Sequence, residues 1–299
     1  MIGDSFEDSI KHRFLLFGDS GTGKTAAVCL AEADLDLDLD SDNFLDGITK
    51  PVGDRGIFLL ACEANALVTA RLVNPSIQHI LCTTKNAVIE VMKAAGSGEL
   101  EQQGVHTLAI DGGTEVQRLL KDAHVGQDVN NSASDKFDWQ LFNETVRRFM
   151  RTVRSLPLDV VMTALVRVRE NDETKQQEVM PSFEGGKTPG EAAQYFAACG
   201  YASRLQRHDG TVQHVVQFSG LPNRYKIKAA GPLRGAVRPC VQAWKAVLDK
   251  RMDRHRIVIP DVVLQTASVA PADPGAPAAD PAAPTTVRSG RPGRAAAAG

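Results

Sequence analysis

Short apolar runs alternate with longer segments of helical periodicity from about residue 10 to residue 260. The apolar runs predict five strands, at Arg13–Phe17, Ile57–Cys62, Ile77–Cys82, Val105–Ile110 and Val160–Leu165. Between the strands the periodicity predicts helices at Lys24–Ala33, Thr84–Ala95 and Trp139–Ser155. Because continuous apolar strands alternate with helices, we expect an α/β fold with a mainly parallel central sheet covered by helices on both faces.

The pattern changes beyond Tyr201, where three short segments alternate polar and apolar residues and are linked by turns. They read YASRLQR (201–207), VQHVVQF (212–218) and RYKIKAA (224–230). Segments of this kind are typical of antiparallel strands. We therefore expect an antiparallel extension at one edge of the sheet.

Composition divides the chain into a short N-terminal segment (1–11), a folded core (12–262) and a tail (263–299). The tail consists mostly of Ala, Pro, Gly, Asp and Arg, so we expect it to be disordered and solvated. The five cysteines are widely scattered without a CxxC pair, which argues against zinc or a disulfide framework and indicates a cytoplasmic protein. The sequence has no apolar run long enough to cross a bilayer, so we expect no membrane partner.

One motif between the first predicted strand and the following helix carries specific chemistry. It matches the pattern G-x-x-x-x-G-K-[ST] in full, with the residues Gly18, Asp19, Ser20, Gly21, Thr22, Gly23, Lys24 and Thr25. In such a loop, backbone N–H groups surround the phosphates of a nucleotide. The lysine, here Lys24, reaches the β- and γ-phosphates, and the hydroxyl of Thr25 binds Mg²⁺. The motif predicts an NTP hydrolase with ATP and Mg²⁺ as cofactors.

Acidic residues at the ends of predicted strands complete this hypothesis. Asp111 ends the apolar run HTLAI, which makes it the candidate for the second acid that holds Mg²⁺. Glu63 directly follows the strand IFLLAC, and carboxyl ends of parallel strands converge on the nucleotide in such sheets. We therefore expect Glu63 to activate water, with Glu115 as the alternative.

Two further segments resemble sites without the full pattern of one. Acidic residues alternate with leucines from Asp34 to Asp42, which leaves open a cation site or a solvated loop. Gly185, Gly186, Lys187 and Thr188 end like a phosphate loop, but Pro181 stands where its first glycine is required. We interpret the second segment as part of a loop.

The second half of the chain resembles the core of the bacterial RecA recombinases. Glu184-Gly185-Gly186 precedes a predicted helix and then the run FAACGYASRL (196–205), which resembles the path from the second DNA loop of the family into a strand beginning Tyr-Ala-Ser. The run KIKAAGPLR (226–234) resembles the Lys-x-Lys segment of the family followed by Ala-Ala-Pro. Together with the phosphate loop, Glu63 and Asp111, the order of parts is similar over roughly residues 12–240.

The resemblance is to a minimal RecA core without the N-terminal polymerisation elements or the large C-terminal domain. It is similar in this respect to bacteriophage RecA-like nucleotide-binding ATPases, which include single-strand annealing proteins of the Sak group. This likeness implies an ATPase of phage recombination in the host cytoplasm that promotes annealing. The implied partners are single-stranded DNA, further copies of the chain in a ring or filament, and a single-strand-binding protein.

The resemblance also implies roles for residues outside the phosphate loop. Lys226 and Lys228 would reach the ATP site of a neighbouring subunit, projecting together from one strand. Thr163 stands where the family has a polar sensor of the γ-phosphate. The polar segment 166–187 becomes the candidate DNA loop, with phosphate or base contacts from Arg167, Arg169, Lys175, Phe183 and Lys187.

Two other function classes share the phosphate loop. A small-molecule kinase would need a lid with paired arginines, for which Arg167 and Arg169 are the nearest candidates on a very acidic segment. A helicase or packaging motor would share the ATPase core and use basic residues of a neighbouring subunit. Stimulation of the ATPase by DNA separates the kinase from the other two classes, and annealing without translocation separates the annealing protein from the motor.

Overall fold

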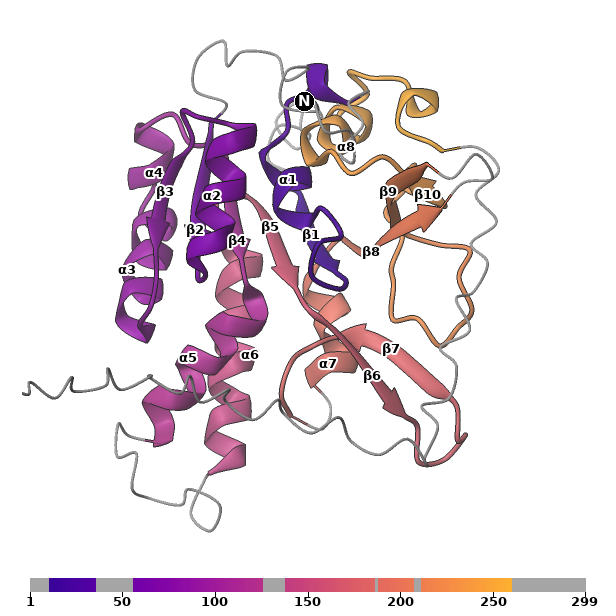
Figure 1. Ribbon diagram of the computed structural model, residues 1–299. Helices are drawn as coiled ribbons and strands as arrows, with labels where there is room; N and C mark the ends of the chain where they lie inside the picture. The colour runs from indigo at the N-terminus through magenta and orange to yellow at the C-terminus, as the bar shows by residue number, and fades with distance from the viewer. Residues whose placement is uncertain (1–10, 36–55, 126–137, 186–187, 207–210, 260–299) are drawn as a thin grey trace, which may run out of the picture. The chain divides into compact units, whose positions relative to one another are not determined.

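The computed structural model describes residues 11–35, 56–125, 138–185, 188–206 and 211–259 (Figure 1). Its main sheet has eight strands in the order β10-β9-β8-β1-β5-β4-β2-β3. In chain order these strands are β1 (Arg13–Phe17), β2 (Ile57–Ala61), β3 (Gln78–Leu81), β4 (Thr107–Asp111), β5 (Asp159–Ala164), β8 (Ala198–Gln206), β9 (Val212–Gln217) and β10 (Ala236–Val237). A separate two-stranded sheet pairs β6 (Val166–Glu170) with β7 (Gln177–Pro181).

Six neighbouring strands of the main sheet, from β8 to β3, run parallel to one another. The strands β9 and β10 extend the sheet beyond β8 in antiparallel order. The predicted fold class, a mainly parallel sheet with an antiparallel extension, is therefore confirmed.

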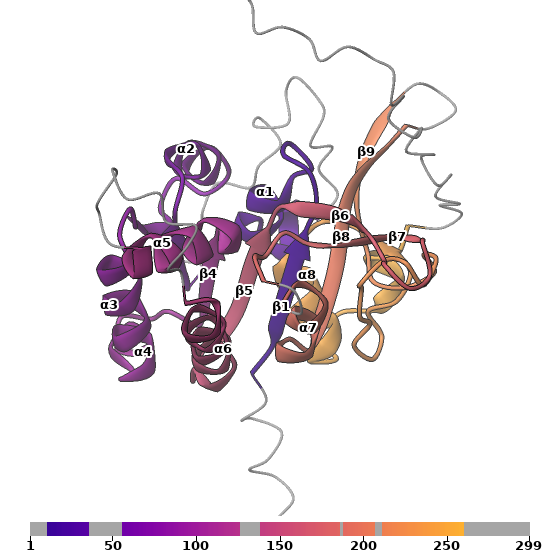
Figure 2. The same cartoon turned by 90° about the horizontal axis from the view of Figure 1, so that it is seen from below.

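Helices cover both faces of the sheet, as the two views show (Figures 1 and 2). They are α1 (Lys24–Cys29), α2 (Ala64–Val73), α3 (Lys85–Gly96), α4 (Glu99–Gln102), α5 (Gly113–Val125), α6 (Trp139–Ser155), α7 (Thr188–Glu191) and α8 (Val241–Leu248). Alternate residues of β1 point to opposite faces, so Phe14 and Leu16 pack with α1, α2 and α8, whereas Leu15 and Phe17 pack with α3, α5 and α6. Each face of the sheet therefore has its own apolar core.

Helix α6 shows how the sequence pattern produces this packing. Its buried residues are Phe142, Val146, Met150 and Val153, which recur at intervals of three and four residues. The helix begins after Asp138, whose side chain accepts a hydrogen bond from the N–H of Leu141. The predicted range Trp139–Ser155 is confirmed.

Helix α1 is shorter than predicted and ends at Cys29 rather than Ala33. Leu30 is extended, and a 3-10 turn at Glu32–Asp34 follows. The carboxylate of Asp34 is buried and accepts a hydrogen bond from the N–H of Ala31 at 2.9 Å, which stabilises this turn in place of another helical turn. The remainder of the acidic segment ending at Asp42 lies outside the described residues.

The segment 224–230 is also different from the prediction, because it forms no strand at the edge of the sheet. It makes isolated bridges instead, from Tyr225 to Val179 of β7 and from Lys228 to Cys199 of β8. The edge position belongs to β10. The short third segment thus joins the small sheet to the main one.

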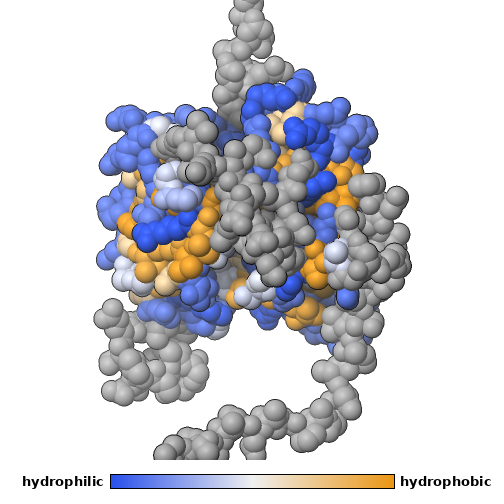
Figure 3. All heavy atoms as spheres, turned by 45° about the horizontal axis from the view of Figure 1, so that its top comes forward, coloured by the Kyte–Doolittle hydropathy of each residue, from blue (hydrophilic) through white to orange (hydrophobic). Residues whose placement is uncertain are grey.

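Some apolar surface remains exposed at the β3 edge of the main sheet, opposite the β10 edge. The side chains concerned lie on α2 and the edge strand β3, and they are Val68, Leu72, Ile80 and Leu81. Figure 3 shows apolar surface in orange on the side of the molecule that carries these elements. Among the helices that the structure describes, none combines the length and apolar character needed to cross a bilayer.

Candidate nucleotide-binding site

The loop Gly18–Gly23 connects the end of β1 to the start of α1, in the middle of the sheet. Gly21 and Gly23 have φ angles of 75° and 80°, which L-residues with side chains rarely adopt. Gly18 is required for a different reason: a methyl group there would overlap the carbonyl oxygen of Ala202 on β8. The glycines therefore allow the backbone to turn tightly against the neighbouring strand.

Lys24 begins α1 and turns its ammonium group toward the loop. The Nζ atom donates to the carbonyl oxygens of Gly18 and Asp19 at 2.9 and 2.6 Å. Burial lowers the pKa of Lys24, while the nearby carboxylates of Asp111, Asp19 and Glu63 act in the opposite direction. A phosphate group beside this ammonium would likewise favour its charged form.

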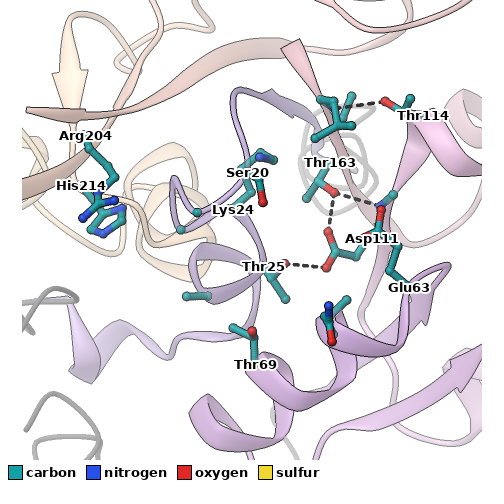
Figure 4. A pocket seen from close by; sticks show the side chains of 18 residues that line it. Ser20, Lys24, Thr25, Glu63, Thr69, Asp111, Thr114, Thr163, Arg204 and His214 are labelled. Atoms are coloured by element: carbon teal, nitrogen blue, oxygen red, sulfur yellow. Dashed lines mark hydrogen bonds between the residues drawn. The ribbon is translucent and has the colours of Figure 1, made fainter. Parts of the chain in front are cut away.

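Asp111, at the end of β4, holds two hydroxyl groups in place (Figure 4). Thr25 donates to Oδ2 at 2.7 Å, and Thr163 of β5 donates to Oδ1. The hydroxyl of Thr163 also accepts a hydrogen bond from the N–H of Gly112 at 3.0 Å. Asp111 and Thr163 are 7% and 2% exposed, whereas Thr25 is half-buried, so the network leads from the core to the surface of the site.

These residues fit Mg²⁺, because a hydroxyl and a carboxylate are hard oxygen donors of the kind that Mg²⁺ prefers. Thr25 and Asp111 already lie in hydrogen-bond contact, so both would lie beside a cation next to the phosphates. Bound Mg²⁺ would neutralise negative charge on the phosphates. In the described part of the chain, this site included, no group of three or more His, Cys, Asp or Glu side chains is arranged to hold a metal ion by itself.

The loop opens into a cavity of about 420 Å³. Glu63, which precedes α2 and is exposed, lines this cavity together with Lys24, Thr25 and Asp111. Glu115 is not among the lining residues and forms an ion pair with Arg118 on α5. The position of Glu63 thus favours it over Glu115 as the residue that activates water, although that role stays a prediction.

The far wall of the cavity contains two residues that sequence reasoning missed, Arg204 and His214 (Figure 4). They are direct partners in the antiparallel pairing of β8 and β9. A methyl group added to Gly23 would lie 2.9 Å from Nδ1 of His214, so the imidazole lies directly against the phosphate loop. No motif marks either residue. Only the register of β8 and β9, which the sequence does not reveal, brings them to the site.

Residues 10–223 match the family described as AAA domain. This match covers the phosphate loop, the candidate acids Glu63, Asp111 and Glu115, and the β6–β7 hairpin. The chain belongs to this AAA domain family. The geometry of the loop and the family match therefore both indicate a nucleotide-hydrolysing ATPase domain. A comparison with curated proteins gives no match.

In this AAA domain the predicted DNA loop is largely an antiparallel hairpin, in which Arg169 of β6 lies opposite Glu178 of β7. Arg167 is exposed, and Lys175 at the tip forms an ion pair with Glu170 at 3.7 Å. The prediction that Phe183 stacks on a base is wrong. Its ring is 1% exposed and packs in the core beneath the hairpin.

Lys187 lies outside the described residues, so its predicted DNA contact is not addressed by the AAA domain structure.

Lys226 and Lys228 do not line the nucleotide cavity of their own chain, and they do not project together as predicted. Lys226 forms an ion pair with Glu178 at 2.8 Å, whereas Nζ of Lys228 donates to the carbonyl oxygen of Phe196 at 2.7 Å. The two residues lie in a segment with isolated bridges rather than in a regular strand, so the alternation of a strand does not apply. Their contact with a neighbouring subunit stays a prediction.

Proposed function

We propose that this chain is an ATP-hydrolysing protein of phage recombination that binds single-stranded DNA and promotes annealing. The observation that carries the proposal is the pair of hydrogen bonds that Asp111 accepts from Thr25 and Thr163 beside the phosphate loop. These bonds keep the proposed Mg²⁺ ligands, Thr25 and Asp111, next to each other. Glu63 lines the same cavity and provides a carboxylate that would activate an attacking water.

The β6–β7 hairpin supports the DNA-binding part of the proposal. It projects as a small separate sheet directly after β5, whose Thr163 contacts Asp111 (Figure 1). Arg167 and Arg169 lie on β6 and would provide phosphate contacts, with Lys175 at the tip. A nucleic acid on the hairpin would thus lie one strand away from the nucleotide site.

The exposed apolar side chains on α2 and β3 support an assembly of several copies, in a ring or a filament. In the described sheet β3 is an edge strand, and with exposed Ile80 and Leu81 it offers a strand edge and apolar area to another chain. In such an assembly, Lys226 and Lys228 would complete the ATP site of a neighbour, and a single-strand-binding protein is proposed as a further partner. We place this activity in the cytoplasm of the host cell.

The test is the ATPase rate of the purified protein with Mg²⁺, with and without a single-stranded oligonucleotide. The proposal expects hydrolysis that single-stranded DNA accelerates, together with annealing of complementary strands. Hydrolysis without any effect of DNA would contradict the DNA-binding part and favour the kinase class. Unwinding or translocation of duplex DNA would assign the chain to the motor class instead.

The intersubunit part has its own test, in which two inactive proteins are mixed. Chains with Lys226→Ala and Lys228→Ala keep the phosphate loop, and Lys24→Ala chains keep both lysines. Recovery of ATPase activity in mixed assemblies is the expected result. Mixtures that co-assemble but recover no activity would place the two lysines outside the active site.

A further inference from the structure

A second cavity lies at the amino end of β1, whereas the phosphate loop lies at the carboxyl end of that strand. Arg13 at the start of β1 lines it, whereas the phosphate loop follows Phe17 at the end of the same strand. Five extended residues span roughly 17 Å, so the two sites are well separated. This second cavity has a volume of about 660 Å³.

The walls of this cavity carry an excess of positive charge. Among the described residues that line it, one is acidic, Glu101, and four are basic: Lys11, Arg13, Arg154 and Lys228. Glu101 lies 3.9 Å from Lys11 and offsets only one of the four charges. We call these four residues and Glu101 the basic pocket.

Arg13 is the central observation, because a guanidinium group is costly to bury without an anion. Its side chain is 7% exposed and donates only to backbone carbonyl oxygens, those of His12 and Leu156, among the described residues. Its Nε atom is buried without a hydrogen-bond partner in the described structure. Burial lowers the pKa of Arg13, and the charge of Asp159 acts in the opposite direction without cancelling that effect.

The carboxylate of Asp159, which acts on the charge of Arg13, already has other partners. It forms an ion pair with Lys245 at 2.6 Å and accepts a hydrogen bond from the N–H of His12 at 2.7 Å. Lys228 likewise donates to a carbonyl oxygen, that of Phe196. Arg154 lies at the end of α6 with its side chain exposed at the rim.

We propose that the basic pocket binds a phosphate group, as a site separate from the ATP site. Phosphate suits this lining because arginine donates two parallel hydrogen bonds to it, and its double charge matches several cations. Gln194 and Tyr195 also line the cavity and offer neutral polar groups to the remainder of the ligand. Two sources share this chemistry, the backbone of a nucleic acid and a free phosphorylated molecule.

The experiment first removes the phosphate loop from the measurement. In a Lys24→Ala background without Mg²⁺, binding of pyrophosphate is measured by equilibrium dialysis, and binding of a fluorescent thymidine oligonucleotide by anisotropy. Arg154→Glu is the test substitution because the residue is exposed and its reversal should not unfold the protein. Arg148→Glu is the matched control, since it reverses an exposed arginine of the same helix outside the pocket.

We expect the Lys24→Ala protein to keep one pyrophosphate site, and Arg154→Glu to weaken it roughly tenfold, as for loss of a charged hydrogen bond. If Arg154→Glu weakens the binding of both pyrophosphate and the oligonucleotide, the site recognises phosphate itself. If it weakens the binding of the oligonucleotide alone, the site recognises the backbone of a nucleic acid. Lys11→Glu, at the same rim, should reproduce the result. Equal effects of Arg154→Glu and Arg148→Glu, or no binding of either ligand in the Lys24→Ala background, would overturn the proposal without affecting the proposed ATPase.

Discussion

Thr163 of β5 contacts two consecutive residues at the end of β4, Asp111 and Gly112, through one hydroxyl group, so its replacement by valine is the most informative single change. The hydroxyl donates to Asp111 and accepts from the N–H of Gly112, and the Thr163 side chain itself is buried. Valine keeps the shape of the side chain and removes both bonds. The family resemblance gives this position a γ-phosphate sensor, but here its hydroxyl is engaged with Asp111.

The expected loss of stability follows from the two groups that lose a hydrogen-bond partner, the carboxylate of Asp111 and the N–H of Gly112. A buried donor or acceptor left unsatisfied costs about 1–3 kcal/mol. Asp111 keeps its bond from Thr25, which reduces its loss. We therefore expect Thr163→Val to lower the free energy of unfolding by roughly 2–4 kcal/mol, which shifts the melting temperature down by roughly 4–16 °C in a domain of this size.

The assay combines thermal unfolding, followed by circular dichroism, with ATPase rates over a range of Mg²⁺ concentrations. Since Asp111 loses one of two fixed contacts, a higher Mg²⁺ concentration should be needed for half-maximal rate. Thr163→Ser keeps the hydroxyl and should retain most of both properties. Thr152→Val, at an exposed position of α6, controls for the loss of a threonine as such. The reasoning would be refuted if Thr163→Val had the same melting temperature as the wild type. It would also be refuted if Thr163→Ser lost as much thermal stability and ATPase activity as Thr163→Val.

Further substitutions test the nucleotide site. Lys24→Ala removes the charge that faces the phosphates, so ATP turnover should fall below detection in a phosphate-release assay; normal turnover would contradict the site itself. Glu63→Gln should bind ATP yet lose about 10²–10⁴-fold in rate, while Glu115→Gln, outside the cavity, should hydrolyse ATP normally, and the opposite pattern would exchange their roles. Gly23→Ala introduces a methyl group 2.9 Å from Nδ1 of His214 at a φ of 80°. The KM for ATP should rise, and an added His214→Ala should restore part of the loss if the collision matters.

The sequence predicted those parts of the fold that depend on local pattern. Apolar runs placed five of the six parallel strands, β1 to β5, within two residues. Four of these five are buried, and a buried parallel strand must be apolar on both faces. The phosphate loop was recognisable because its glycines and its lysine serve a function that no other residues can perform. Asp111 could be chosen because the end of a central strand in such a sheet faces the nucleotide.

What escaped prediction depends on contacts between distant segments. Phe183 follows a polar stretch, and nothing local reveals that the hairpin folds its ring into the core. Arg204 and His214 reach the cavity only through the register of β8 and β9. The early end of α1 depends on a buried carboxylate, that of Asp34, which capped a turn where periodicity alone favoured a helix.

The separate partners of Lys226 and Lys228 change how the proposed assembly would work. Lys226 is hydrogen-bonded to Glu178, and this bond, with contributions from Asn171 and Arg169, lowers the pKa of that carboxyl. The same carboxylate therefore holds a lysine proposed to reach a neighbour and an arginine proposed to contact DNA. If Lys226 moves to the ATP of a neighbouring subunit, Glu178 interacts more strongly with Arg169, which is then less available to DNA. If instead a DNA phosphate binds Arg169, Glu178 interacts more strongly with Lys226. In the proposed function, DNA binding at the hairpin and the intersubunit contact thus oppose each other through one residue, and by linkage each weakens the other equally.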